Sequence, residues 1–190
     1  MDVGLVGLGW YHRAAHAPAL LGTRCASLCR VHSAVVRTSS AAADALDAQL
    51  YLDERRDIVR HESFEIMLAA MGDASVDTVI LALPIDVQPV VLRAAFEADR
   101  AAGHAVHVLS EKPIAPSLRE GLALWRAYAA ACARATARRA PPPLWAVLEN
   151  WQCKPAAVHL VKSVRRGVIG AVHSFALCRF VDARGDSGGG

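Results

Sequence analysis

The sequence predicts an α/β fold with a doubly wound parallel sheet, and two features of its pattern lead to this class. Short apolar runs alternate with longer amphipathic runs over the first 150 residues, which is typical of repeated strand–helix–strand units. Residues 76–83, VDTVILAL, are apolar almost throughout, as in a parallel strand that is buried on both faces. We therefore expect helices on both sides of the sheet.

The alternating pattern sets the order of the elements. Strands are expected at 3–8, 25–32, 76–83, 105–109 and 144–148, with helices at 12–21, 39–49, 63–71, 87–100 and 117–137. A further helix at 155–166 and a strand at 172–181 precede a glycine-rich tail, and such a pair cannot close a core by itself. We expect one domain at 1–150 and, at 151–190, the start of a second α/β domain that is truncated or is completed by a partner.

Composition and charge exclude several classes of protein. The chain of 190 residues is 54% hydrophobic and 21% charged, which argues against disorder, and its net charge of +3 comes without a basic stripe of the kind that binds nucleic acid. Its five cysteines are scattered and odd in number, which fits a reducing compartment better than a disulfide framework. With no leader peptide and no apolar run of membrane length apparent, we expect a cytoplasmic protein without nucleic-acid, membrane or metal partners.

A glycine-containing turn, Gly7-Leu-Gly9-Trp10-Tyr11-His12, follows the first expected strand. In a dinucleotide site the first glycine allows a tight turn, the second lets backbone N–H groups approach the pyrophosphate, and a small third residue keeps helix and strand close. The helix that follows would offer its unpaired amides to the phosphates. We therefore expect Gly7, Gly9, Trp10 and Tyr11 to contact a dinucleotide, although His12 in the third position leaves open a strand-to-helix turn without a ligand.

The second expected strand is followed by no carboxylate that could bind a ribose. Between Asp2 and Asp44 the chain has neither Asp nor Glu, whereas NAD-preferring sites commonly place one there to accept from the 2′-hydroxyl. A guanidinium and hydroxyl groups suit a 2′-phosphate instead, and Ser33 and Arg37 are the candidates. The expected cofactor is thus NAD or NADP, with NADP slightly favoured, and a solvated loop is the alternative reading of this segment.

Another apolar strand ends abruptly in Glu111-Lys112-Pro113, where Gly, Asn or Ser would be more usual. Pro84 and Asn150 also follow expected strands, as the glycine turn does. Ligands of open α/β sheets bind outside the carboxyl ends of the strands, so these residues are expected to meet at one edge of the sheet. An ordinary charged loop is the alternative for Lys112.

Several motifs, taken in order, resemble the Gfo/Idh/MocA family of glucose–fructose oxidoreductase, inositol dehydrogenase and their relatives. They are Gly7-Leu-Gly9 with Pro18-Ala-Leu20, Leu81-Ala-Leu-Pro84, Glu111-Lys112-Pro113, Ala146-Val-Leu-Glu149-Asn150 and Gly167-Val-Ile-Gly170-Ala-Val172. The resemblance covers residues 3 to about 177. It implies a Rossmann domain followed by a second α/β domain, whose open sheet carries substrate and oligomer contacts.

The resemblance also implies roles for single residues. Lys112 would lie beside the nicotinamide and the reacting oxygen of the substrate, where its ammonium could stabilise developing negative charge. Glu111 would position Lys112 or contact ribose, and Pro113 would stiffen the turn. Pro84 would line the nicotinamide pocket. The remaining expected cofactor contacts come from Leu83, Gln88 and Asn150.

The resemblance implies an NAD(P)-dependent oxidoreductase that moves a hydride to or from a hydroxyl or carbonyl carbon of a sugar, polyol or related small molecule. Two departures from the family pattern matter. His12 stands where the family has a small residue, and neither His159 nor His173 matches the acid–base histidine that many catalytic members supply from the second domain. The alternative is a non-catalytic dinucleotide-binding member of the same family. The second-domain sheet, if complete, would also support a homo-oligomer.

Overall fold

The computed structural model describes residues 2–7, 9, 11–22, 28–35, 58–70, 76–98, 106–150 and 153–174. The chain divides into two compact units, Met1–Leu148 and Glu149–Gly190. Of the described elements, the first unit contains the whole sheet and the helices that cover it, and the second contains one helix, α7.

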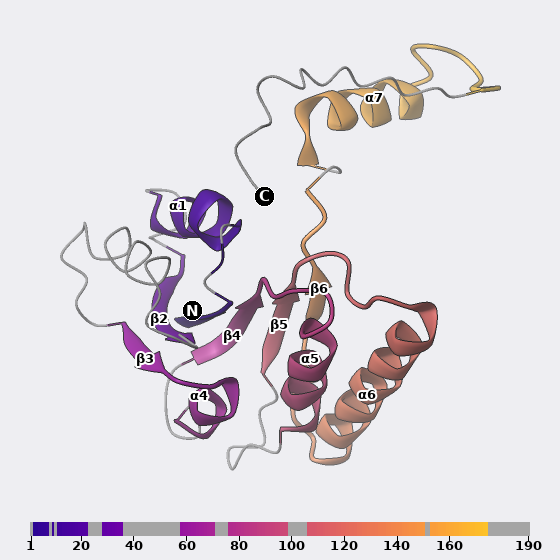
Figure 1. Ribbon diagram of the computed structural model, residues 1–190. Coiled ribbons are helices and arrows are strands. Elements are labelled where there is room, and N and C mark those ends of the chain that lie inside the picture. The colour runs from indigo at the N-terminus through magenta and orange to yellow at the C-terminus, as the bar shows by residue number, and fades with distance from the viewer. Residues whose placement is uncertain are drawn as a thin grey trace. The chain divides into compact units, whose positions relative to one another are not determined.

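The first unit is built on a six-stranded parallel sheet (Figure 1). Its strands are β1 (Asp2–Val6), β2 (Arg30–Val35), β3 (Val59–His61), β4 (Val76–Leu81), β5 (His107–Ser110) and β6 (Trp145–Val147). They lie in the order β3-β2-β1-β4-β5-β6, and every pairing is parallel. The chain starts at β1, builds outward to β3, and then crosses back to place β4 on the other side of β1. The strand order therefore reverses between β1 and β4, which is where doubly wound sheets bind their ligands.

Helices cover both faces of this sheet (Figure 1). A π turn, η1 (His12–His16), continues into α1 (Ala17–Leu21) on one face, while α4 (Phe64–Ala70), α5 (Gln88–Glu97) and α6 (Leu118–Ala137) lie on the other. α6 begins with Ser117 as its N-cap, because the Ser117 hydroxyl accepts from the Glu120 N–H at 3.3 Å. The same hydroxyl donates to the Glu120 carboxylate at 2.9 Å.

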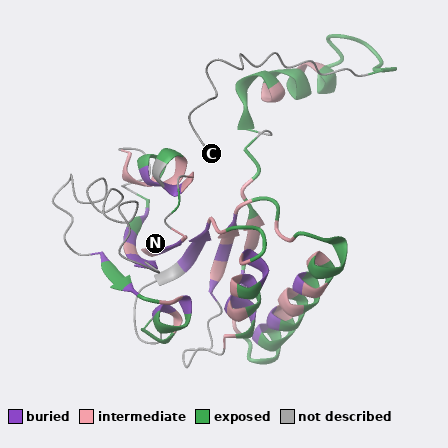
Figure 2. Ribbon diagram, in the orientation of Figure 1, coloured by how far each residue is buried: buried purple, intermediate pink, exposed green. Residues whose placement is uncertain are grey.

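Two apolar layers join these helices to the sheet, and β1 contributes to both because its side chains alternate. Val3 and Leu5 belong to the layer beneath α1, whereas Val6 belongs to the layer beneath α4, α5 and α6. Gly4 leaves room for α4, since a Cβ there would lie 3.2 Å from the Met67 sulfur. The inner strands β1, β2 and β4 are consequently mostly buried, whereas the edge strands β3 and β6 carry exposed residues (Figure 2). The helices that cover the sheet are buried only on their inner faces.

The expected fold class is confirmed, and the expected second strand is wrong in its bounds. Residues 28 and 29 precede the strand, which runs from Arg30 to Val35. Its register is set by pairing with β1, where Arg30 lies opposite Asp2 and donates two hydrogen bonds to the Asp2 carboxylate, at 3.1 and 2.7 Å. The apolar run that predicted a strand at 25–32 does not show how the strand pairs with β1.

The sequence reading also missed β3, a three-residue strand, Val-Arg-His, that is too short and too polar to show a period. The expected helix at 39–49 lies outside the described residues. Of the expected strand at 172–181, only 172–174 are described, and they are not in a strand.

The second unit contains α7 (Pro155–Arg165), which is amphipathic and begins with a proline in its first turn. Among its apolar side chains, Leu160, Val161 and Val164 are exposed within this unit. None of the helices that the structure describes, in either unit, has the length and apolar character needed to cross a membrane.

Candidate functional site

The carboxyl ends of four neighbouring strands form one continuous edge in the first unit. The N–H of Ala82, which follows β4, donates to the last carbonyl of β1 at 3.0 Å. The N–H of Glu111, which follows β5, donates to the last carbonyl of β4 at 2.9 Å, and the N–H of Leu148 donates to the last carbonyl of β5 at 2.8 Å. The glycine turn after β1 and the Glu111 turn after β5 therefore flank the residues after β4, as expected from the sequence.

Gly7 and Gly9, in the turn after β1, differ in whether the fold itself requires a glycine. Gly7 has φ +89°, and a Cβ on it would lie 2.4 Å from the Ala82 carbonyl oxygen and 2.7 Å from Leu83 Cδ2. Only glycine fits there, because both the backbone conformation and the close approach exclude a side chain. Gly9 is exposed, and a Cβ on it would meet no described atom within 4 Å. The fold therefore has no need of a glycine at residue 9, whereas a ligand that approaches the backbone would.

His12 is fully buried although it holds the third position of the glycine motif. Its Nε2 lies 3.2 Å from the Val6 carbonyl oxygen and so carries the hydrogen, and its Nδ1 has no partner among the described residues. Burial, helped by the neighbouring His16, lowers the pKa of His12 to about 4, against the smaller effect of backbone carbonyls. The imidazole is thus neutral at pH 7.

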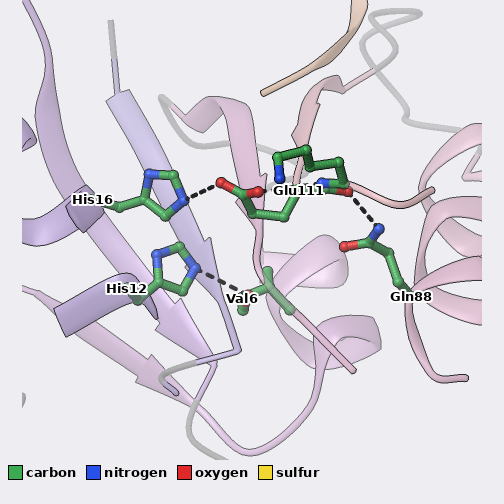
Figure 3. Close-up of polar contacts among 6 residues, drawn as sticks. Val6, His12, His16, Gln88 and Glu111 are labelled. Carbon is green, nitrogen blue, oxygen red and sulfur yellow. Dashed lines mark hydrogen bonds and ion pairs between the residues drawn. The ribbon is translucent and has the colours of Figure 1, made fainter. Parts of the chain in front are cut away.

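His12 also begins the helical segment that follows the glycine turn. The first turn is a π turn, in which the Ala17 N–H donates to the His12 carbonyl, five residues back. The ring points toward the Val6 carbonyl oxygen (Figure 3).

Gln88, at the start of α5, holds the Glu111–Lys112–Pro113 turn from below. Its side-chain Nε2 donates to the carbonyl oxygen of Glu111 at 2.7 Å (Figure 3). It also donates to the carbonyl oxygen of Pro113 at 2.9 Å. Gln88 is 1% exposed, and two carbonyl partners identify the nitrogen of the amide, since an amide oxygen could not donate to them. The Lys112–Pro113 peptide bond is cis. Gln88 therefore contacts the turn itself, and its expected contact with a cofactor stays a prediction.

Glu111 turns its carboxylate toward η1 on the opposite side from Gln88 (Figure 3). One oxygen, Oε1, lies 3.0 Å from His16 Nε2, and the other, Oε2, accepts from the Lys112 N–H at 3.2 Å. The His16 contact is at ion-pair distance, but its N–H is not well aligned for a hydrogen bond. Burial lowers the pKa of His16, and the Glu111 carboxylate opposes that effect without overcoming it. His16 was missed at the sequence level, where nothing links it to a residue so much later in the chain.

Lys112 itself is exposed at this edge. Its backbone is fixed by the turn, and its ammonium forms no ion pair within the described part of the chain. Pro84 is also exposed, and its carbonyl oxygen accepts from Val87 and Gln88, both at 2.9 Å, so that α5 starts directly behind the edge. The exposed ammonium of Lys112 is therefore available to a ligand at this edge of the sheet.

The other expected contacts are placed differently. Ser33 was expected in the loop after the second strand, but it lies within β2, 2% exposed, with its Oγ 2.9 Å from His32 Nδ1. Trp10 and Arg37 lie outside the described residues. Asn150 is exposed and belongs to the second unit. The described site therefore consists of the glycine turn with Tyr11, the residues after β4, and the Glu111 turn.

These residues fit a dinucleotide. The open space at Gly9 leaves the backbone of the turn accessible, and the helical segment that follows begins at the switch in strand order. Gly7, Gly9 and Tyr11 could hold the pyrophosphate, and Leu83 with Pro84 could border a nicotinamide. When bound, such a cofactor supplies a hydride donor or acceptor, and the exposed Lys112 could serve the reacting oxygen.

Comparisons with known proteins agree with this geometry. The family described as an oxidoreductase family with an NAD-binding Rossmann fold, GFO_IDH_MocA, matches residues 1–137. The dehydrogenase FPY6 of Fusarium mangiferae is 30% identical over 156 residues, which are 80% of this chain and 39% of that protein. The present chain thus spans about two fifths of the length of this relative.

Solved structures share the fold. The WlbA dehydrogenase of Chromobacterium violaceum, in complex with NADH and UDP-GlcNAcA, superposes with a TM-score of 0.66 at 24% identity, over 90% of this chain and 41% of that one. The myo-inositol 2-dehydrogenase of Lactobacillus plantarum gives a TM-score of 0.67 at 15% identity, over 90% and 42%. The family match over residues 1–137, together with the strand order and the placement of the glycine turn, shows that this chain belongs to the Gfo/Idh/MocA family of NAD-binding oxidoreductases.

Proposed function

We propose that this protein is an NAD(P)-dependent oxidoreductase that moves a hydride between the cofactor and a hydroxyl or carbonyl carbon of a sugar, polyol or related small molecule. The observation that carries the proposal is the position of Lys112. It is presented by a turn that Gln88 fixes, at the edge where the strand order reverses and beside a glycine turn that only Gly7 can form.

Lys112 would act as the electrostatic partner of the substrate oxygen. Its ammonium would donate a hydrogen bond to the alkoxide or carbonyl oxygen as charge develops there during hydride transfer. The glycine turn, with Trp10 and Tyr11, would hold the pyrophosphate. A dinucleotide between the two turns would bring its reactive end toward Lys112.

The choice between NAD and NADP rests on Arg37. No carboxylate stands between Asp2 and Asp44, so a ribose 2′-hydroxyl has no acceptor of the usual kind there, while a guanidinium suits a 2′-phosphate. We propose a preference for NADP on this ground. Titration of NADPH and NADH against the protein tests it, and tighter binding of NADH would contradict the role of Arg37.

The substrate class is proposed from the names of similar proteins. One solved relative holds UDP-GlcNAcA and another is an inositol dehydrogenase, and both substrates carry secondary hydroxyl groups on a six-membered ring. A panel of inositols, hexoses and UDP-sugar acids, followed by absorbance of the reduced nicotinamide, would reveal which of them is turned over.

A matched pair of glycine substitutions tests the cofactor site. Neither Gly9 nor Gly121, in α6, has a described atom within 4 Å of an added Cβ, so Gly9→Ala and Gly121→Ala should both fold. We expect Gly9→Ala to weaken NADPH or NADH binding by about tenfold or more, equal to 1.4 kcal/mol, because its methyl group would occupy the approach to the backbone. Gly121→Ala should bind normally. Equal binding by the two variants would contradict the placement of the cofactor.

Replacement of Lys112 tests the catalytic role. Lys112→Ala should lower turnover by about a hundredfold, as the removal of one charge-stabilising donor commonly does, with little change in dinucleotide affinity. Lys162→Ala, on exposed α7, is the control. If the protein binds a dinucleotide but turns over nothing in the panel, the non-catalytic alternative replaces the enzyme. If Lys112→Ala retains full turnover, Lys112 has no catalytic role.

A further inference from the structure

The ring of His16 is held in a fixed direction by two aromatic neighbours, one before η1 and one within it. It makes edge-to-face contacts with Tyr11, at 5.2 Å between ring centroids, and with His12, at 4.9 Å. The side chain is 15% exposed. Aromatic contacts with two rings restrict the rotation of the His16 ring. The direction of its Nε2 is therefore set by the start of η1, to which both neighbours belong or adjoin.

That direction leads to Glu111, whose carboxylate has two separate partners. Oε1 lies 3.0 Å from His16 Nε2, and Oε2 accepts from the Lys112 N–H at 3.2 Å (Figure 3). The Glu111 side chain is 13% exposed, so water competes weakly for either oxygen. A single carboxylate thus joins the helix after the glycine turn to the backbone of the residue that carries the ammonium.

Gln88 fixes the same turn on its other side, through the carbonyl oxygens of Glu111 and Pro113. Those two bonds hold the turn to α5 and leave it without a bond to η1. The contact between His16 and Glu111 links the Glu111 turn to η1, the helical segment that follows the glycine turn. Gln88 does not make this link.

We propose that His16 is a positioning residue for Lys112, acting through the Glu111 carboxylate, and that it couples dinucleotide binding at the glycine turn to the placement of the Lys112 turn. This inference rests on the proposed function, since it takes the glycine turn as the site of the dinucleotide. A shift of η1 when a ligand binds is passed to Glu111 by the fixed ring, and loss of the contact frees the Lys112 amide.

A variant series in the full chain separates this role from a merely structural one. The variants are His16→Ala, His16→Gln, Glu111→Gln and the double variant of His16→Ala with Glu111→Gln, with His159→Ala as the exposed control. Amide hydrogen exchange at Lys112 is measured without ligand, and NADPH and NADH are titrated by nicotinamide fluorescence. Thermal unfolding is recorded in parallel.

We expect His16→Ala to speed exchange at Lys112 and to weaken dinucleotide binding about fivefold, the lower end of ordinary coupling between sites. His16→Gln keeps an N–H donor and should restore part of both effects. The double variant should bind no more weakly than the weaker single variant, because both substitutions remove one contact. His159→Ala should match the wild type.

Two results would overturn the inference. One is unchanged exchange at Lys112 in His16→Ala, which would mean that the ring does not hold the turn. The other is additive loss of affinity in the double variant, which would mean that His16 and Glu111 act independently. If the wild type binds neither NADPH nor NADH, the proposed function fails on its own. The coupling to dinucleotide binding then falls with it, while exchange at Lys112 still decides whether His16 positions the turn.

Discussion

Acid should destabilise the first unit through His12, whose imidazole is fully buried and neutral. The pKa of this group is about 4 in the folded chain, against 6.5 for an ordinary histidine. Between these two values the unfolded chain binds a proton that the folded chain does not. Stability from this source is therefore complete above pH 6.5, and it is lost as the pH falls toward 4.

The size of the effect follows from linkage. Each pH unit over which only the unfolded state is protonated costs about 1.4 kcal/mol, so the full range costs about 3 kcal/mol. Between pH 7 and pH 5 the loss is about 2 kcal/mol. Burial also lowers the pKa of His16 and of His61, so both histidines add to the loss of stability in acid.

The perturbation that isolates His12 is His12→Leu, compared with His159→Leu at an exposed position. Urea unfolding at pH 7, 6 and 5, followed by tryptophan fluorescence and circular dichroism, gives the free energy of unfolding for each protein. His12→Leu removes the titrating group, so its free energy of unfolding should fall by about 2 kcal/mol less than that of the wild type between pH 7 and 5. The absolute stability of the variant, which also reflects repacking, is not the test.

Parallel curves for the wild type and His12→Leu would refute this reasoning. They would mean that His12 is protonated equally in the folded and unfolded states, and so that the ring is not buried beneath the glycine turn. A change of slope in His159→Leu as large as that in His12→Leu would contradict it equally.

Three further substitutions have expected outcomes. Gly7→Ala should destabilise the unit by at least about 2 kcal/mol in urea unfolding, because the positive φ and the nearby carbonyl both exclude a Cβ; a fully stable variant would contradict the tight turn. Gln88→Met should cost about 2 kcal/mol, because the carbonyl oxygens of Glu111 and Pro113 lose their donor inside the fold, and thermal unfolding would show no change if those bonds were absent. Ser117→Ala should cost about 1 kcal/mol by removal of the α6 cap, with Ser117→Asp as the rescuing control and circular dichroism melting as the measurement.

Much of the site could be predicted because its residues follow strands directly. Gly7, Pro84 and Lys112 were expected at one edge, and the backbone bonds between successive strand ends place them there. Residues further from a strand end were harder. Ser33 was expected in a loop, yet pairing with β1 extends β2 past it and buries its side chain.

The roles of Gln88 and His16 also lay beyond the sequence. Gln88 was expected to contact a cofactor, and nothing in the sequence indicated that its amide also holds two carbonyl oxygens of the Glu111 turn. His16 offered no signal of any kind. Both side chains act on a turn that lies far from them along the chain, and no local pattern reports such a contact.

The sequence by itself determined the fold class, the alternation of strands and helices, and the glycine that the first turn requires. These depend on periodicity and on backbone freedom, which are properties of neighbouring residues. The tertiary structure alone decided the bounds of β2, the existence of β3, the neutral His12 and the joining of His16 to Glu111. Strand register, desolvation and contacts between distant segments arise only when the chain has folded. The sequence indicated that Lys112 follows a strand at the edge of the sheet, and the tertiary contacts decide how its turn is held.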